Sequence, residues 1–249
     1  AVFLASDDCH VSLSKALRVM GLKDESLQKV PTDGNGELDV SYLYSNLKKI
    51  RSEGKKCFAV VATAGSTVRG AIDPLPSIAE FCQKENIWLH IDGAIGGIFG
   101  LSKSTSEIVT GLSSADSITI NPQKILGIAK TSSLLLVANK YNLFSTFSTG
   151  LPYAEPISGD NFHGGEVGIQ GTRSAEVLKL WLGLRHLGEQ GIEKILLESI
   201  ERKRYLESII DLSKFELISG PLHILAITPK GYTSSQATDW SIKTRTSLL

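Results

Sequence analysis

The chain has 249 residues, of which 42% are hydrophobic, and its 26 Lys and Arg residues are balanced by 26 Asp and Glu residues. This composition is ample for a sizeable core, and the charge balance gives no global field that would favour nucleic acid or an anionic membrane. No apolar run reaches the roughly 18 residues needed to span a bilayer, and no charged-then-apolar leader opens the chain. Three widely spaced cysteines, Cys9, Cys57 and Cys82, favour reduced thiols in a cytoplasmic protein.

Strand-like and helix-like segments alternate along the chain, which favours an α/β fold with a mostly parallel sheet covered by helices. The first half predicts a strand at 1–5, a helix at 12–20, a turn at 31–36, a helix at 39–50, a strand at 58–62, a helix at 76–85 and a strand at 87–92. Because the chain opens on a strand without an initiator methionine, we expect it to start partway through a larger protein.

The second half begins with a strand-like run at 117–124 and a strand at 132–137. The stretch 141–165 is rich in Gly, Pro and Ser and predicts a long functional or mobile loop. Helices are expected at 173–187 and at 192–210, with Gly188 and Gly191 between them, followed by strands at 215–218 and 224–228. The predicted domains are 1–190, a large domain, and 191–249, the beginning of a smaller one.

An acid and an amine close two of these apolar runs. Asp92 ends the run 87–92, and Lys124 ends the run 117–124. Ligands of α/β sheets gather just outside the carboxyl ends of the strands. Pyridoxal phosphate needs a lysine for its Schiff base and an acid that keeps its ring nitrogen protonated. The spacing alone is equally compatible with a strand-end acid and an exposed lysine that never meet.

Four segments in order, 6–12, 63–74, 88–94 and 121–124, resemble the group II pyridoxal-phosphate-dependent amino-acid decarboxylases. That family includes the glutamate, aromatic-amino-acid, cysteine-sulfinate and diaminobutyrate decarboxylases. The resemblance runs from the first strand to about Gly191 and more weakly to the end. It implies a fold type I large domain, pyridoxal 5'-phosphate as cofactor, decarboxylation of an L-amino acid to its amine, and a homodimer with active sites at the subunit interface.

The same resemblance implies roles for five residues around the cofactor ring. Lys124 would form the Schiff base, and Asp92 would hold the pyridinium nitrogen. His10, a predicted catalytic residue, would stack on one face of the ring and Ala94 would pack on the other, while Thr67 would contact the cofactor. Without the family context, the histidine reads as a surface residue at a helix entry, the threonine as a local backbone cap and the alanine as ordinary close packing.

Four further residues follow from the resemblance. Asn121 is expected near the cofactor phosphate, and Gln123 stands where the family usually has a histidine, so it can donate a hydrogen bond but brings no proton that titrates near neutral pH. Tyr153 matches the mobile-loop tyrosine that reprotonates the α-carbon. Arg173 matches an arginine that binds the substrate carboxylate. An exposed loop tyrosine and a helix-face salt bridge are the alternatives for the last two.

His90 lies two residues before Asp92, so both side chains point to one face of their strand. It is predicted either to orient the carboxylate or to be a satisfied core histidine. A metal site built from these two residues with His10 and His163 is disfavoured, because no tight ligand spacing supports it.

The family's phosphate-binding turn has no equivalent in the nine residues before His10, and the C-terminal end stops within the expected small domain. We therefore expect these 249 residues alone to bind the cofactor poorly and to be inactive. Three other functions remain open: a different pyridoxal enzyme such as a carbon–carbon lyase or aldehyde synthase, an inactive paralogue or truncated product that acts only as an interaction partner, and a nucleotide-binding domain. The last is disfavoured because no Gly-rich phosphate loop follows a strand.

Overall fold

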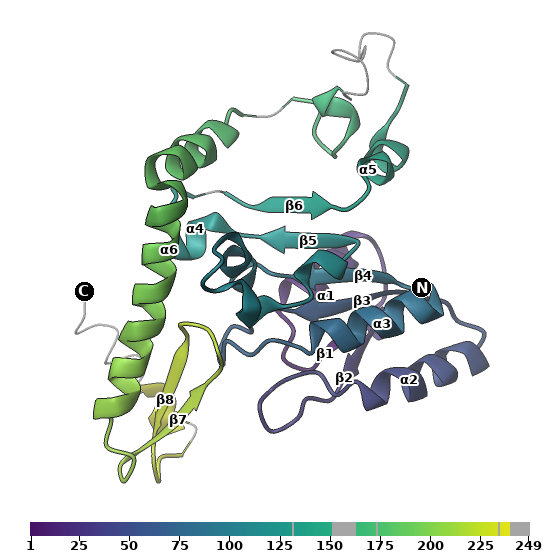
Figure 1. The fold of residues 1–249 in the computed structure, drawn as a ribbon. Helices are drawn as coiled ribbons and strands as arrows, with labels where there is room; N and C mark the ends of the chain where they lie inside the picture. The colour runs from purple at the N-terminus through teal and green to yellow at the C-terminus, as the bar shows by residue number, and fades with distance from the viewer. Residues whose placement is uncertain (131, 151–162, 173, 234, 240–249) are drawn as a thin grey trace.

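The protein is built on a six-stranded sheet with the order β2-β1-β3-β4-β5-β6 (Figure 1). The structure, a computed structural model, describes residues 1–130, 132–150, 163–172, 174–233 and 235–239. Strands β1 to β5 pair in parallel, and β6 pairs with β5 in the antiparallel direction. The strands are β1 (Val2–Ser6), β2 (Leu27–Val30), β3 (Cys57–Thr63), β4 (Trp88–Asp92), β5 (Ser117–Ile120) and β6 (Leu134–Val137). This confirms the predicted α/β fold with a mostly parallel sheet.

Helices connect most of the strands, and the apolar faces of the helices between β2 and β4 are buried against the sheet. The α-helices are α1 (Ser12–Val19), α2 (Ser41–Ser52), α3 (Leu75–Glu85), α4 (Pro122–Ile125), α5 (Lys140–Phe147) and α6 (Val177–Ile209). Short 3-10 helices are η1 (Asp24–Ser26), η2 (Gly96–Leu101), η3 (Ser106–Val109), η4 (Leu112–Ser114) and η5 (Gly164–Glu166). Leu43 and Leu47 of α2 and Ile78 and Phe81 of α3 pack with strand residues such as Val60 in one core. The helical spacing of these residues explains why α2 and α3 cover one face of the sheet (Figure 1).

The run that ends at Lys124 is not a single strand, which corrects the sequence-based prediction. Strand β5 stops at Ile120, and Pro122 begins the one-turn helix α4, in which Lys124 lies. Proline fits the first turn of a helix, because its missing N–H has no partner there in any case. The lysine therefore stands one short helical turn beyond the strand end.

The stretch 141–165 also differs from the prediction, because α5 occupies its beginning. The side chain of Asn139 accepts a hydrogen bond from the backbone N–H of Tyr141 and caps the helix. The helix is followed by residues 148–150, and the part of this stretch at 151–162 lies outside the described residues.

Helix α6 runs alongside the sheet and ends near the hairpin of β7 (Phe215–Ser219) and β8 (Leu225–Pro229) (Figure 1). It begins at Val177, and the described residues 174–176, which the prediction placed in the helix, precede it. Of the two glycines predicted to interrupt it, Gly188 is the one with non-helical backbone angles, with φ 60° and ψ −179°. The predicted domain boundary at 190–191 falls inside this helix, and the division into two domains stays a prediction.

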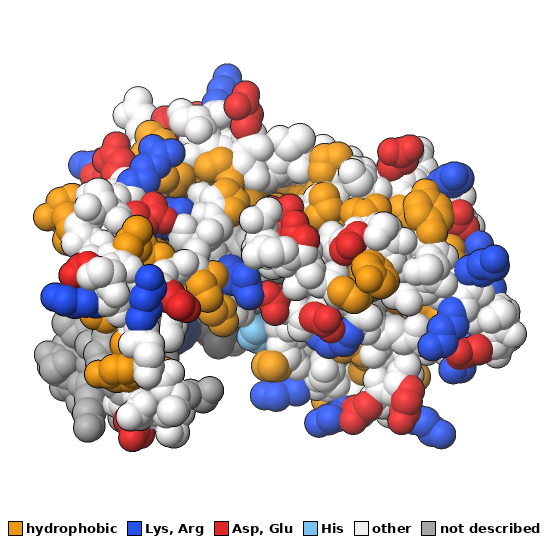
Figure 2. Space-filling model, turned by 90° about the horizontal axis from the view of Figure 1, so that it is seen from below, with side chains coloured by type: hydrophobic (Ala, Val, Ile, Leu, Met, Phe, Trp, Pro, Cys, Tyr) orange, Lys and Arg blue, Asp and Glu red, His pale blue; other side chains and the backbone are white. Residues whose placement is uncertain are grey.

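The surface carries charges of both signs. In Figure 2, basic and acidic side chains are interspersed over the visible face, and apolar side chains lie between them. Within the described residues, no helix combines the length and the apolar character needed to cross a membrane.

Candidate functional site

A cavity of about 390 Å³ lies at the carboxyl ends of the parallel strands. Strands β1, β3, β4 and β5 all end at this edge of the sheet, so the segments that follow them converge there. Six of the nine predicted site residues line the cavity: His10, Thr67, Asp92, Ala94, Asn121 and Lys124. The structure thus brings the acid and the amine to one cavity, as the sequence predicted.

The other three predicted residues are not placed in this cavity. The side-chain oxygen Oε1 of Gln123 accepts a 2.6 Å hydrogen bond from the backbone N–H of Ser132, and the residue is not part of the cavity wall. A contact between its amide and the cofactor stays a prediction. Tyr153 and Arg173 lie outside the described residues.

Asp92 is the last residue of β4, and its orientation is fixed by the turn that follows. Its Oδ1 accepts a 3.1 Å hydrogen bond from the backbone N–H of Ala94. In the sheet it stands directly across from Thr63 of β3 on one side and Thr119 of β5 on the other. Directly opposed residues project to the same face, so the carboxylate is flanked by two hydroxyl-bearing side chains, both of which line the cavity.

His90 shares this face, but both of its ring nitrogens interact with β5. Nδ1 lies 2.8 Å from Oγ of Ser117, and Nε2 lies 3.2 Å from Oγ1 of Thr119. The indole Nε1 of Trp88 donates to the same serine hydroxyl at 2.9 Å. The serine hydroxyl accepts that bond and can donate its own proton to Nδ1 of His90, which favours the histidine tautomer that carries its proton on Nε2.

Desolvation lowers the pKa of His90, and the nearby charge of Asp92 opposes this effect. The ring is therefore a neutral, hydrogen-bonded histidine in the wall of the cavity. This arrangement matches the prediction of a satisfied histidine, since the hydrogen bonds of both ring nitrogens join it to β5.

Thr63 is a residue of the cavity that the sequence analysis did not single out. It is 5% exposed, and its hydroxyl Oγ1 has no hydrogen-bond partner. Its backbone is held firmly, because its N–H donates to Oδ2 of Asp73 at 2.7 Å and its carbonyl accepts from the N–H of the same residue at 2.9 Å. Burial raises the pKa of the Asp73 carboxyl from 3.8 to about 6, although its bonds from the backbone of Thr63 and Leu38 oppose the shift.

His10 stands at the entrance to α1. Its Nδ1 accepts a 3.2 Å hydrogen bond from the backbone N–H of Ser12 and lies 2.8 Å from the hydroxyl of that residue. The side chain is exposed and lines the cavity at the same time. The two interpretations offered by the sequence, a helix-entry histidine and a ring-stacking histidine, are therefore compatible.

The turn before Lys124 links three segments of the cavity wall. The N–H of Asn121 donates to the carbonyl of Ala94 at 3.3 Å, and its side-chain Oδ1 accepts a 2.6 Å bond from the hydroxyl of Ser133. The N–H of Lys124 in turn donates to the carbonyl of Asn121 at 3.0 Å. These bonds hold the base of the lysine near the end of β4.

Close backbone packing completes the wall. A Cβ on Gly96 would lie 2.5 Å from the carbonyl oxygen of Ala64, and Gly65 has a positive φ of 101°. The segment after β3 can approach the segment after β4 only because these two positions lack side chains. Leu222 from the β7–β8 connection is fully buried against the same two glycines.

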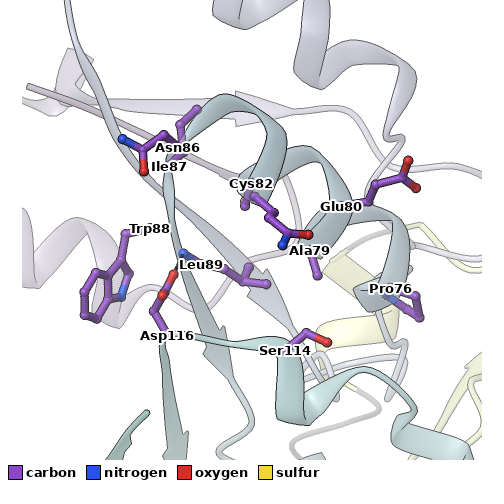
Figure 3. A pocket seen from close by; sticks show the side chains of 11 residues that line it. Pro76, Ala79, Glu80, Cys82, Asn86, Ile87, Trp88, Leu89, Ser114 and Asp116 are labelled. Atoms are coloured by element: carbon purple, nitrogen blue, oxygen red, sulfur yellow. Dashed lines mark hydrogen bonds between the residues drawn. The ribbon is translucent and has the colours of Figure 1, made fainter. Parts of the chain in front are cut away.

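A second, larger cavity of about 800 Å³ lies at the opposite, amino-terminal ends of β4 and β5 (Figure 3). Its charged lining residues are Glu80 of α3 and Asp116, whose Oδ2 accepts a 2.7 Å bond from the N–H of Leu89. It offers two carboxylates and no lysine or arginine among its lining residues. Its chemistry does not suit a phosphate-bearing group, so the smaller cavity is the candidate active site.

Comparison with known families matches residues 1–228 to the pyridoxal-dependent decarboxylase conserved domain. The cysteine sulfinic acid decarboxylase of Rattus norvegicus is 34% identical over 222 residues, which cover 87% of this chain and 45% of that protein. The acidic amino acid decarboxylase GADL1 of Mus musculus is 32% identical over 225 residues, which cover 88% and 41%. The aromatic-L-amino-acid decarboxylase of Bacillus atrophaeus is 32% identical over 233 residues, which cover 92% and 48%. The chain spans less than half the length of each of these relatives.

Solved structures show the same fold. The apo form of mouse CSAD superposes with a TM-score of 0.83 at 29% identity and covers 96% of this chain and 52% of that chain. The Oryza sativa TDC structure with PLP and tryptamine has a TM-score of 0.87 at 21% identity, with 96% and 51% covered, and supports the fold alone.

Proposed function

The chain belongs to the pyridoxal-dependent decarboxylase family, and from that premise we propose that its protein decarboxylates an L-amino acid to the corresponding amine and CO2. The observation that carries the proposal is the convergence on one cavity of Asp92, at the end of β4, and Lys124, in the short helix that follows the neighbouring strand β5. An amine for the cofactor's aldehyde and a carboxylate for its ring nitrogen are the two groups that this chemistry requires.

The residues of the cavity fit pyridoxal phosphate. The amine and the carboxylate stand in the same wall, and the buried hydroxyl of Thr63 beside Asp92 lacks a partner. Buried polar groups without partners are rare in native proteins, so the unpaired hydroxyl supports a rearrangement of the polar side chains of this wall when a polar group binds beside them. When bound, the cofactor supplies a protonated ring that withdraws electrons from the substrate's α-carbon.

The chain's own residues position the reaction. Lys124 attaches the cofactor, and Asp92, held by the N–H of Ala94, keeps the ring nitrogen protonated. His10, Ala94 and Thr67 line the same cavity, where the first two would enclose the ring and the third would contact the cofactor. Loss of CO2 is fastest when the scissile bond stands perpendicular to the ring, so exact placement of these groups is the protein's main contribution.

Phosphate contacts come from the turn before the lysine. Asn121 keeps its Oδ1 on Ser133, which leaves its amide N–H groups free to donate to an anion, and Gln123 is proposed to act beside it. Tyr153 is proposed to return a proton to the α-carbon and Arg173 to bind the substrate carboxylate. A phenol and a forked guanidinium are chemically suited to these two roles.

The proposal includes a homodimer in the cytoplasm. The first half of α6 exposes Leu178, Trp181 and Leu182, each more than half exposed, and a row of large apolar side chains on one helix is typical of an interface. Cys9, Cys57 and Cys82 are unpaired, which supports a reducing compartment.

The test is an amino-acid panel assayed for CO2 and amine with the purified full-length protein and its Lys124→Ala variant. We expect stoichiometric CO2 and amine from one class of acidic, aromatic or diamino substrate, and none from the variant. An aldehyde as the product would favour the aldehyde-synthase alternative. Absence of turnover with every substrate would favour an inactive interaction partner.

A further inference from the structure

The hydroxyl of Thr63 is a buried polar group in the cavity wall that none of the predicted roles uses. Thr63 is 5% exposed and its Oγ1 has no partner, whereas its backbone N–H and carbonyl are both bonded to Asp73. Thr105, the other buried threonine among the described residues, illustrates the contrast, because its Oγ1 donates to the carbonyl of Phe99 at 2.7 Å. Leaving a buried hydroxyl unpaired is unfavourable, so this group is expected to have a partner in the working enzyme.

The register of the sheet identifies that partner. Thr63 and Asp92 are directly opposed on β3 and β4, and neighbouring strands lie about 4.8 Å apart. Both side chains line the same cavity. One oxygen of the carboxylate, Oδ1, is engaged by the N–H of Ala94. The other, Oδ2, is an acceptor on the side chain directly opposed to the hydroxyl in the sheet.

We propose that Thr63 is a positioning residue for the cofactor, whose hydroxyl donates a hydrogen bond to the Asp92 carboxylate and holds it toward the ring nitrogen. This inference rests on the proposed function. Together with the N–H of Ala94, it gives the carboxylate one fixed donor on each side. The backbone of Thr63 is anchored by Asp73, so the hydroxyl starts from a rigid strand end.

Three variants of the full-length protein test this role. Thr63→Val has nearly the same shape but no hydroxyl, Thr63→Ser keeps the hydroxyl, and Thr105→Val removes a buried hydroxyl outside the cavity wall as the matched control. The measurements are the dissociation constant of pyridoxal phosphate by absorbance titration and the midpoint of urea unfolding without cofactor.

We expect Thr63→Val to weaken cofactor binding about tenfold, the size of one hydrogen bond to a charged group, and Thr63→Ser to restore it within twofold. Because the hydroxyl has no partner without cofactor, Thr63→Val keeps or raises the unfolding midpoint. Thr105→Val does the opposite, with a lower midpoint and unchanged cofactor affinity. A residue that only packs in the core would not separate the two readouts in this way.

A double-mutant cycle with Asp92→Asn isolates the contact. If Thr63 acts through the carboxylate, Thr63→Val has no further effect on cofactor affinity in the Asp92→Asn background. Equal losses in both backgrounds, unchanged affinity of Thr63→Val, or failure of Thr63→Ser to restore binding would overturn the inference. If Thr63→Val does not fold, Thr63→Ala against Thr63→Ser decides by the same criteria. A wild-type protein without a Lys124-dependent cofactor band would instead refute the proposed function itself.

Discussion

Asp73 makes the stability of the cavity wall depend on pH. Its side chain is 3% exposed, and its two oxygens accept hydrogen bonds from the N–H groups of Leu38 at 2.8 Å and Thr63 at 2.7 Å. Desolvation raises its pKa from 3.8 to about 6, with smaller contributions in the same direction from Glu37 and Asp8. The carboxylate therefore joins the segment before α2 to the end of β3. Burial of its negative charge is unfavourable, which is why its pKa is raised.

The sign and size of the effect follow from this shift. Because the pKa of Asp73 is higher in the folded state than in the unfolded state, the folded state binds the proton more tightly, and stability falls as pH rises from about 4 to about 6. A shift of about 2 pKa units corresponds to ~3 kcal/mol in total. Integration of the linkage relation puts about half of this loss, roughly 1–2 kcal/mol, between pH 5 and pH 7.5, with the remainder below pH 5.

The assay compares urea unfolding of the wild type and Asp73→Asn at these two pH values. The asparagine does not titrate, so the free energy of unfolding of the variant relative to wild type should rise by about 1–2 kcal/mol from pH 5 to pH 7.5. Asp211→Asn is the control, because the hydroxyl and N–H of Ser213 lower the pKa of that carboxyl below 3.8, so it is ionised in both states between pH 5 and pH 7.5 and the relative stability of this variant should stay nearly constant. A relative stability of Asp73→Asn that does not change with pH, or that falls, would refute the reasoning.

Two further predictions concern backbone packing and loop anchoring. Gly96→Ala should destabilise the protein by about 1–3 kcal/mol in chemical denaturation, because its Cβ would meet the carbonyl oxygen of Ala64 at 2.5 Å. The control Gly34→Ala has nothing within 4 Å of the new Cβ and should be close to neutral. Equal effects of the two substitutions would contradict this packing. Glu166→Gln should speed hydrogen exchange of the Thr149 amide, because the Glu166 carboxylate accepts hydrogen bonds from both the N–H and the hydroxyl of Thr149. Hydrogen bonds to this carboxylate, the largest effect coming from the hydroxyl of Ser148, lower the pKa of Glu166, so the wild type should lose this protection only in acid. Unchanged exchange in the variant would rule out the anchor.

The sequence was sufficient for elements with strong apolar patterns. Strands β3 and β4 and helices α2 and α3 match their predictions closely, because continuous apolar runs or helical spacing reflect burial directly. The convergence of Asp92 and Lys124 on one cavity was also predictable, because parallel strands end at the same edge of a sheet.

Other features depend on contacts that a local pattern does not contain. The sequence of strand β2 (Leu27–Val30) shows no clear alternation of apolar and polar residues. The strand forms because it pairs with β1 at the edge of the sheet. Helix α5 starts at the cap provided by Asn139, a signal that a polar stretch obscures. Thr63 was missed for a different reason: its importance lies in a hydroxyl without a partner, which becomes visible only when its neighbours are placed.

The most direct test of the central claim is an absorbance titration of the full-length protein with pyridoxal phosphate, in the wild type and in Lys124→Ala and Asp92→Asn. Because both residues line one cavity, we expect saturable binding with a visible absorption band that is absent in Lys124→Ala and shifted and weakened in Asp92→Asn. A band that persists without the lysine, or an Asp92→Asn titration identical to that of the wild type, would contradict the account.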